Sequence, residues 1–195
     1  MCLIDLQLAM AKLYSDQSLR NNFLNTPQLT GIQLGLSDLE IKKLEASFYQ
    51  INFFADSLKN KRMNEVTKFF HLSYSRLKNE FEELFDQYAL TYLPSGIKKH
   101  QDDSEKFVNY INNIQTVNED LKTLLNYELV NFKMYNIKFC FKIKLFDRYL
   151  IDFLKDYTPQ LLSRVDEKKI IYSKRYCIAI WIKFYPDGKL WHIVF

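Results

Sequence analysis

The side chains that most often carry catalysis or bind metals are few in this sequence of 195 residues. Its three cysteines and three histidines lie far apart: Cys2, Cys140 and Cys177, and His71, His100 and His192. A zinc site needs ligands at short, regular spacings, and a catalytic Cys–His pair is usually accompanied by a local signature around the nucleophile. Because the sequence has neither pattern, we expect the cysteines to be packing residues, with no metal and no cofactor.

The carboxylates and the glycines form no catalytic motif either. General acid–base catalysis needs titratable groups that converge in a cleft with separated pKa values. The acidic run Glu80-Phe81-Glu82-Glu83 is instead typical of the solvated face of a helix. Four isolated glycines cannot form a phosphate-binding loop. The sequence therefore predicts a protein that is not an enzyme.

Positive charge is concentrated in the C-terminal third of the chain. Residues 137–195 contain 12 Lys and Arg against 6 Asp and Glu, whereas residues 1–136 contain 15 against 17. The same third holds 13 of the 31 aromatic residues. Basic residues interleaved with aromatic ones suit single-stranded nucleic acid, and they suit equally an acidic peptide added to a sheet edge. The plainer interpretations are a solvated basic face and aromatic packing in the sheet core.

Helix signals organise the first two-thirds of the chain. Gly35 can end one helix and Ser37 can begin the next, because Ser37 and Glu40 have the spacing of a reciprocal capping box. We expect this pair to be structural. Apolar residues at helical spacing then continue to Leu58, which predicts one long helix. It should end in the basic run Lys59–Arg62, because positive charge interacts favourably with the negative, C-terminal end of the helix dipole.

Two further pairs show the capping-box spacing ahead of apolar runs. They are Asp102 with Glu105, and Thr116 with Glu119. Together with the few Gly and Pro residues, four of each, these signals predict a helical bundle over residues 1–135.

The apolar spacing changes to a period of two near residue 139. Apolar and polar residues alternate over 139–145, and again over 178–184. The segment Tyr185–Lys189 contains Pro-Asp-Gly, which is typical of a turn, and an apolar segment follows it to the C-terminus. We therefore predict an α+β protein, in which residues 136–195 form a small antiparallel sheet with short inserted helices, packed on the bundle.

We expect the binding surface to lie on this sheet. The alternation places the lysines opposite their Phe and Ile neighbours, and Trp181 shares the parity of Lys183. This pattern predicts an exposed Trp181, a common interface anchor, and the alternative is that inserted helices cover it. The candidate binding residues are Lys142, Lys144, Arg175, Trp181, Lys183 and Trp191. An alternative site consists of two basic stretches, with residues Lys59, Lys61, Arg62, Lys98, Lys99 and His100.

Several segments together resemble one bacterial family. They are Leu13–Asp16 with Leu19, Arg20 and Phe23; Pro27; Gly35–Glu40; Phe54–Leu58 with Lys61 and Arg62; Asp102 and Asp103 with Phe107; and Tyr127–Leu129. The chain resembles small helical proteins described as DNA-binding domains, or as accessory subunits encoded beside multinuclear non-haem iron oxidases. The methanobactin-type C subunits of peptide-modifying pathways belong to this family. The resemblance covers residues 6–135 and implies a helical N-terminal domain, a β-containing C-terminal part and a role in binding rather than chemistry.

The predicted function is therefore that of a non-catalytic accessory or binding subunit. The resemblance implies two partners, an enzyme of the multinuclear iron oxidase type that holds the iron, and a substrate peptide. The alternative is a nucleic-acid-binding regulatory protein, with weak and non-specific binding, since no recognition helix is evident. The N-terminus lacks the signal-peptide pattern, and no apolar run approaches about 20 residues. We thus expect a cytoplasmic protein without a membrane partner.

Overall fold

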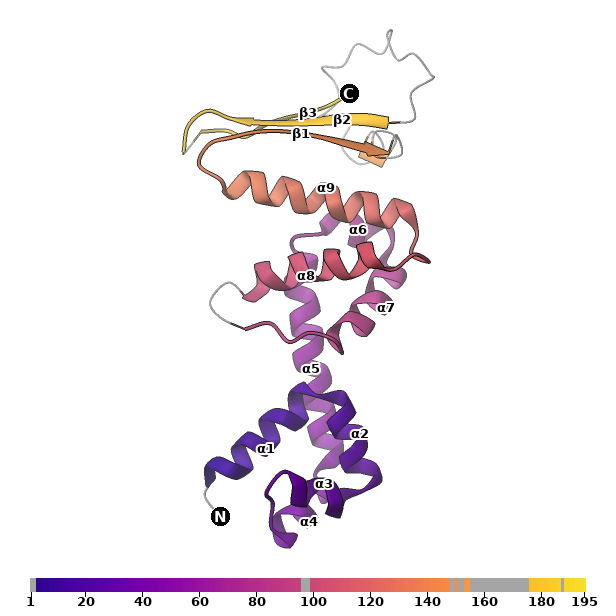
Figure 1. Cartoon of the computed structure of the whole chain (residues 1–195), viewed down its shortest axis with the longest axis vertical. Helices are drawn as coiled ribbons and strands as arrows, with labels where there is room; N and C mark the ends of the chain where they lie inside the picture. Colours follow the sequence, from indigo (N-terminus) through magenta and orange to yellow (C-terminus); the bar gives the residue numbers. More distant parts are fainter. Residues whose placement is uncertain (1–2, 96–98, 148–149, 151–152, 155–175, 187) are drawn as a thin grey trace. The chain divides into compact units, whose positions relative to one another are not determined.

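The structure is a computed structural model that describes residues 3–95, 99–147, 150, 153–154, 176–186 and 188–195. These residues are mostly helical, with a three-stranded antiparallel sheet near the C-terminus (Figure 1), which confirms the predicted α+β class. The chain divides into two compact units. Unit 1 contains residues 1–66 and 82–103, and unit 2 contains residues 67–81 and 104–195. Unit 2 therefore includes the sheet together with helices that precede residue 136.

Unit 1 begins with five helices. They are α1 (Leu3–Ser15), α2 (Gln17–Asn25), α3 (Pro27–Gln33), α4 (Asp38–Ala46) and α5 (Phe48–Thr67), of which the last residue belongs to unit 2. Asp16 caps α2 by accepting a hydrogen bond from Leu19 N at 2.9 Å. The buried Arg20 donates to Leu13 O at 2.8 Å and so satisfies a carbonyl at the end of α1. The two helices are thereby fixed at their junction.

The glycine between α3 and α4 ends a helix as the sequence predicts. Gly35 has a φ of 78°, in the left-handed region that favours glycine. Its N–H donates to Ile32 O at 2.9 Å, and Leu36 N donates to Gly31 O at 2.9 Å. This pair of hydrogen bonds is the Schellman motif. The motif satisfies two of the last carbonyls of α3 and turns the chain toward α4.

The predicted capping box at Ser37 and Glu40 is confirmed. Ser37 is the N-cap of α4, and its N–H donates to Glu40 Oε2 at 3.0 Å. The Ser37 hydroxyl also contacts Glu40 Oε2. These hydrogen bonds lower the pKa of Glu40 below its ordinary value, because they stabilise the charged carboxylate. The pair positions the start of α4.

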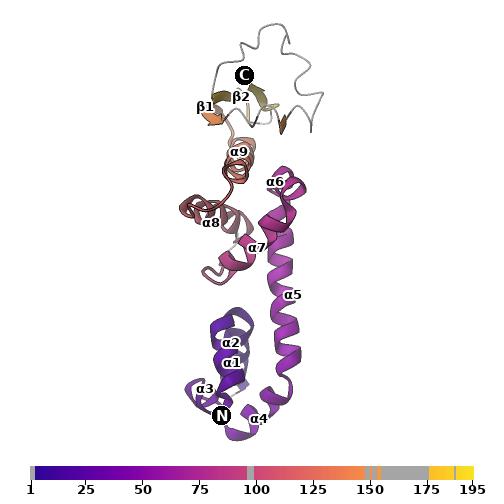
Figure 2. The same ribbon diagram turned by 90° about the vertical axis from the view of Figure 1, so that its right-hand side faces the viewer.

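The prediction of a single helix from Ser37 to Leu58 is wrong, because the chain breaks at Ser47. Ser47 has non-helical dihedrals, and its N–H is shared between Lys43 O and Leu44 O at 3.1 Å each, which tightens and closes the last turn of α4. Figure 2 shows the sharp turn from α4 into α5. Since α5 continues to Thr67, the run Lys59–Arg62 lies inside a helix and does not compensate the dipole at its end.

The next four helices are α6 (His71–Arg76), α7 (Lys78–Ala89), α8 (Lys99–Asn113) and α9 (Glu119–Asn136). Their starts correct two predicted capping boxes. Helix α8 already includes Lys99, so Asp102 lies in its first turn and is not its cap. Helix α9 is capped by Asn118, which accepts from Asp120 N at 2.8 Å, and not by Thr116. The spacing S/T/D-x-x-E thus indicated the region of each helix start but not its first residue.

The sheet consists of β1 (Cys140–Asp147), β2 (Tyr176–Lys183) and β3 (Trp191–Val194) in the order β1-β2-β3. Both pairings are antiparallel, as predicted. The turn before β3 is closed by a hydrogen bond from Gly188 N to Tyr185 O at 3.0 Å. The short helices predicted between β1 and β2 fall mainly on residues outside the described set. No helix in the described ranges has the length and apolar character needed to cross a membrane.

Candidate protein-interaction surface

Helix α9 covers one face of the sheet, which we call the inner face (Figure 1). Cys177, Ala179 and Trp181 on β2 are fully buried there and pack with Leu124 and Tyr127 of α9. Among the described residues, α9 together with Leu150, Phe153 and Leu154 forms the layer that buries this face of the sheet. The sheet is held against α9 mainly by apolar contact.

The predicted exposure of Trp181 is wrong. Its side chain has no accessible surface, because it lies between β3 and α9. The indole N–H donates to Asn131 Oδ1 on α9 at 3.1 Å, and the ring stacks on that of His192 with centroids 5.0 Å apart. Trp181 is therefore a core residue with a satisfied polar atom, and it cannot anchor a partner.

The opposite, outer face of the sheet has three adjacent rows of apolar residues. The antiparallel register aligns its residues in three rows across the strands, since paired residues point to the same side of a sheet. The rows are Phe141–Ile182–Trp191, Ile143–Ile180–Ile193 and Leu145–Ile178–Phe195. Seven of these nine residues are exposed, and only Ile180 and Ile182 on the central strand are half-buried. We call these nine residues the outer face.

The size of this surface distinguishes it from ordinary surface residues. Phe141 is 70% exposed, and Trp191 and Phe195 are about half exposed. At about 150–250 Å² per aromatic side chain, the three aromatic members alone leave roughly 350 Å² of apolar surface accessible. The aliphatic members bring the area to about the upper end of the 300–600 Å² range of the largest patch on a typical monomer. None of the nine residues carries a charge.

The candidate lysines lie on the inner-face side, where they border the core. Lys142 is exposed at the edge strand β1, whereas Lys144 and Lys183 are half-buried. Burial lowers the pKa of Lys144, and the charges of Lys142 and Lys133 lower it further. Lys183 Nζ donates to Tyr135 O at 3.1 Å. The structure thus separates these cations from the exposed aromatic residues of the outer face.

Of the six candidate residues, only Trp191 lies on the outer face, and Arg175 lies outside the described residues. The other eight members of the outer face were not predicted, because the candidate residues were chosen on the lysine side of the strands, opposite the Phe and Ile residues. One signal was available. Strand β2 is apolar on both faces, with Cys177, Ala179 and Trp181 opposite Ile178 and its neighbours, so covering one face of the sheet leaves apolar residues on the other.

The alternative basic site contains both engaged and exposed side chains. Lys59 Nζ is paired with Asp86 Oδ1 at 2.8 Å, and Lys61 and Lys99 are exposed. His100 is half-buried, and Lys98 lies outside the described residues. Arg62 faces the interior of unit 1, where it is engaged by Asp103. Two of the four described lysine and arginine residues of this set are therefore already paired with carboxylates.

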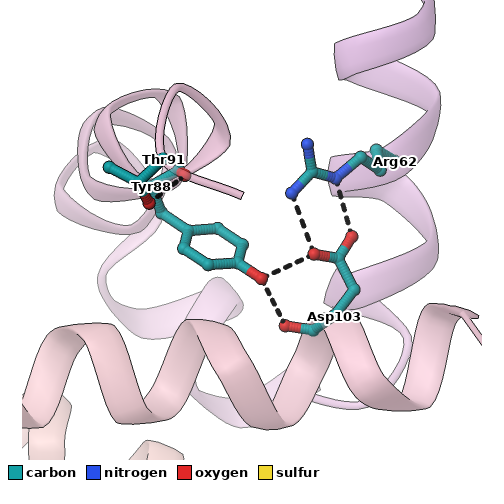
Figure 3. Close-up of polar contacts among 4 residues, drawn as sticks. All are labelled: Arg62, Tyr88, Thr91 and Asp103. Carbon is teal, nitrogen blue, oxygen red and sulfur yellow. Dashed lines mark hydrogen bonds and ion pairs between the residues drawn. The ribbon is translucent and has the colours of Figure 1, made fainter. Parts of the chain in front are cut away.

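Arg62, Asp103 and Tyr88 form a buried polar network in unit 1 (Figure 3). The guanidinium of Arg62 donates to the carboxylate of Asp103 through two hydrogen bonds, Nε to Oδ2 at 2.8 Å and Nη2 to Oδ1 at 2.9 Å. The Tyr88 hydroxyl lies 2.7 Å from the same Oδ1. Burial, with the adjacent carboxylate, raises the pKa of Tyr88, so the phenol keeps its proton and donates it. The network connects α5, α7 and α8.

Glu128 is a buried carboxylate in unit 2, on α9. Its oxygens accept hydrogen bonds from Leu72 N at 2.6 Å, Ser73 N at 2.9 Å and Ser73 Oγ at 2.5 Å. It therefore caps the first turn of α6 from another helix. Burial raises the pKa of Glu128 to about 7, although the three donors act in the opposite direction. A carboxyl with such a pKa is also typical of acid–base catalysts, but here all its contacts are structural.

The Glu128 pKa predicts a specific pH dependence of stability. The folded state binds the proton more tightly than the unfolded chain, so the free energy of unfolding should fall as the pH rises from about 4.5 to about 7. This difference in pKa between the unfolded and folded states corresponds to about 3 kcal/mol of unfolding free energy. We expect this decrease in the parent and not in Glu128→Gln, measured by urea denaturation across this range. Parallel pH profiles of the two proteins would contradict the assignment.

Unit 1 contains an apolar groove of about 420 Å³, lined by residues of α1, α4 and α5. Its lining includes Met10, Tyr14 and Phe54, with Tyr14 and Phe54 in edge-to-face contact at 4.7 Å. Glu40 and Lys43 are its charged lining residues, and Glu40 is engaged by Ser37. The groove offers mainly hydrophobic contact.

Comparisons with known proteins add no family or neighbour to these features. Searches against protein-family models, curated proteins and solved structures found no match. Within the part of the chain that the structure describes, no group of three or more His, Cys, Asp or Glu side chains is arranged to hold a metal ion. The outer face of the sheet is thus the feature from which a function is best argued.

Proposed function

We propose that this protein is a non-catalytic binding subunit that attaches to a partner protein through the outer face of its sheet. The observation that carries the proposal is the continuous, uncharged apolar surface formed by three rows of side chains. The largest exposed apolar patch of a monomer is often functional at this size. The patch is large enough to form the apolar centre of a standard interface, which covers about 800 Å² per partner.

The chemistry of the outer face indicates what kind of surface its partner presents. Because the nine residues have no charge and no hydrogen-bonding side chain except the indole N–H of Trp191, they fit an apolar surface with few charges. Phe141 and Trp191 lie on either side of Ile182 in one row of the face, and aromatic residues are common energetic anchors. Following the family resemblance, we infer that the partner is a peptide-modifying enzyme of the multinuclear iron oxidase type, and that the partner carries the metal chemistry.

The nucleic-acid alternative has less support. Single-stranded nucleic acid is bound by cations that follow the backbone beside stacking aromatic residues. In the described part of the sheet, the exposed aromatic residues lie on the outer face and the strand lysines lie on the other side. No observation therefore favours this function over protein binding.

The proposal is tested by site-specific photo-crosslinking in cells that naturally contain the chain. A benzoylphenylalanine replaces Phe141 in one variant and Tyr49 in another. Tyr49 is equally suited to labelling because it is 78% exposed, but it lies in unit 1. We expect light to join the Phe141 variant to one defined second protein, identified by mass spectrometry, and the Tyr49 variant to form no such adduct.

The adduct must depend on the rest of the outer face. Leu145→Glu places a charge on the same face without removing a buried side chain, and it should abolish the crosslink while leaving the folded chain intact. An adduct with a second copy of the chain would contradict the proposal and indicate a homo-oligomer. The absence of any adduct from position 141 would contradict it as well.

A further inference from the structure

Lys144 is a half-buried lysine on the edge strand β1, on the inner-face side of the sheet. Its Nζ lies 5.1 Å from the centre of the ring of Phe146, a core residue that packs with Tyr127 of α9. Nζ forms no ion pair with a carboxylate of the described residues. It is also not one of their fully enclosed unpaired polar atoms, so solvent and small reagents reach it. The amine is thus held at the border of the core without a counter-charge from that part of the chain.

Two further cations lie near this amine. Lys142 is two positions earlier on the same face of β1, and Lys133 belongs to α9, the helix that covers this face. Burial lowers the pKa of Lys144, and the positive charges of Lys142 and Lys133 lower it further. The ring of Phe146 favours the ammonium and so limits the decrease. At a given pH, a larger fraction of Lys144 than of a solvent-exposed lysine is therefore the neutral amine, which is the nucleophilic form.

The neighbouring cations also suit a bound anion. Lys142 is exposed and forms no ion pair with a described carboxylate, whereas Lys133 is paired with Glu105 at 2.9 Å. Lys142 therefore supplies the larger share of the uncompensated positive charge near Lys144. Phosphate groups bind ammonium groups through strong, charge-assisted hydrogen bonds. The cluster thus places a cation that can hold a phosphate two residues from a lysine that can act as a nucleophile.

We propose that Lys144 is a site of acylation by small acyl phosphates. Lys142, assisted by Lys133, holds the phosphate, and the neutral amine of Lys144 attacks the adjacent carbonyl carbon. A bond forms between Nζ and this carbon, and the bond from the carbon to the bridging phosphate oxygen breaks. The phosphate leaves with the electron pair of that bond and takes up the proton that the amine releases. The product is an uncharged amide on the inner-face side, so the proposal is independent of the partner-binding outer face.

The test is acetylation of the purified full-length protein by acetyl phosphate, followed by mass spectrometry of its peptides at successive times. Two exposed lysines are internal references, Lys142 on the same strand and Lys61 in unit 1. We expect Lys144 to be acetylated at least about fivefold faster than either, because the anion is concentrated beside an amine that is more often neutral. With the uncharged reagent N-hydroxysuccinimidyl acetate, this preference should be smaller. Added inorganic phosphate should slow only the reaction of Lys144 with acetyl phosphate.

Two matched variants examine the phosphate-binding cation. Lys142→Gln removes it, and Lys138→Gln removes an exposed lysine that precedes β1. We expect acetylation of Lys144 by acetyl phosphate to slow at least about threefold in the first variant and to change less than about 1.5-fold in the second. Equal rates in the two variants, or acetylation of Lys144 no faster than that of Lys61 in the parent, would overturn the proposal. An equal preference for Lys144 with both reagents would overturn it too, because it would indicate a reactive amine without a phosphate site.

Discussion

Replacing Asp103 by alanine should destabilise the protein by about 3–5 kcal/mol, because the change leaves a buried guanidinium without its counter-charge. Asp103 is fully buried and receives two hydrogen bonds from Arg62 and one from Tyr88 (Figure 3). Its removal thus leaves the Arg62 guanidinium without these two acceptors, while the Tyr88 hydroxyl can still donate to the main-chain carbonyl of residue 103, 3.1 Å away. The loss should be measured as the free energy of unfolding in urea at pH 7.

The adjacent residue provides the control for this prediction. Asp102 is exposed and lies in the first turn of α8, so Asp102→Ala should cost no more than about 1 kcal/mol of favourable interaction with the helix dipole. Asp103→Asn retains the shape of the side chain and part of its hydrogen bonding. Its decrease in the free energy of unfolding should therefore lie between those of Asp103→Ala and Asp102→Ala. If Asp103→Ala and Asp102→Ala were equally mild, the buried network would not support unit 1.

Trp181→Ala should destabilise the protein by about 3–5 kcal/mol, as is typical when a large buried aromatic side chain is truncated. Trp181 contacts the rings of Tyr127, Phe146 and His192 and binds Asn131 through its indole N–H. Its loss would open a cavity between the sheet and α9 and leave Asn131 without its partner. Thermal or urea unfolding of the variant measures the effect.

Trp191 gives the matched comparison, since it is the only other tryptophan in the sequence. It is 49% exposed on the outer face, so Trp191→Ala should change the free energy of unfolding by about 1 kcal/mol or less. Its effect on partner binding should instead be large, at least about 2 kcal/mol, as for an aromatic anchor. A strongly destabilised Trp191→Ala with Trp181→Ala near the parent would reverse the assignment of the two faces.

The sequence predicted those features that depend on local signals. The Gly35–Ser37 junction combines a left-handed glycine with a cap, and both act within a few residues, so they were correctly located. The period-two alternation likewise identified the strands and their antiparallel order. Helix continuity was less accessible, because the break at Ser47 interrupts an apolar stripe that continues on both sides.

The features that depend on long-range packing could not be predicted. Alternation along a strand separates two faces but does not say which of them is covered, and here α9 covers the face of Trp181 and leaves Phe141 exposed. The role of Arg62 also depends on long-range packing. Its basic neighbours suggested an exposed patch, but its partner Asp103 is 41 positions away in the sequence. Such partners are defined only by the folded chain.

The exposure of the outer face is the central claim, and oxidative footprinting of the two tryptophans tests it most directly. Hydroxyl radicals oxidise accessible indoles, and mass spectrometry reports the rate at each position. In the purified monomeric chain we expect Trp191 to be oxidised several times faster than Trp181, and in intact cells we expect Trp191 to be protected by the bound partner. If Trp191 and Trp181 were oxidised equally slowly in the purified monomer, the outer face would already be covered. That result would contradict the proposed interaction surface.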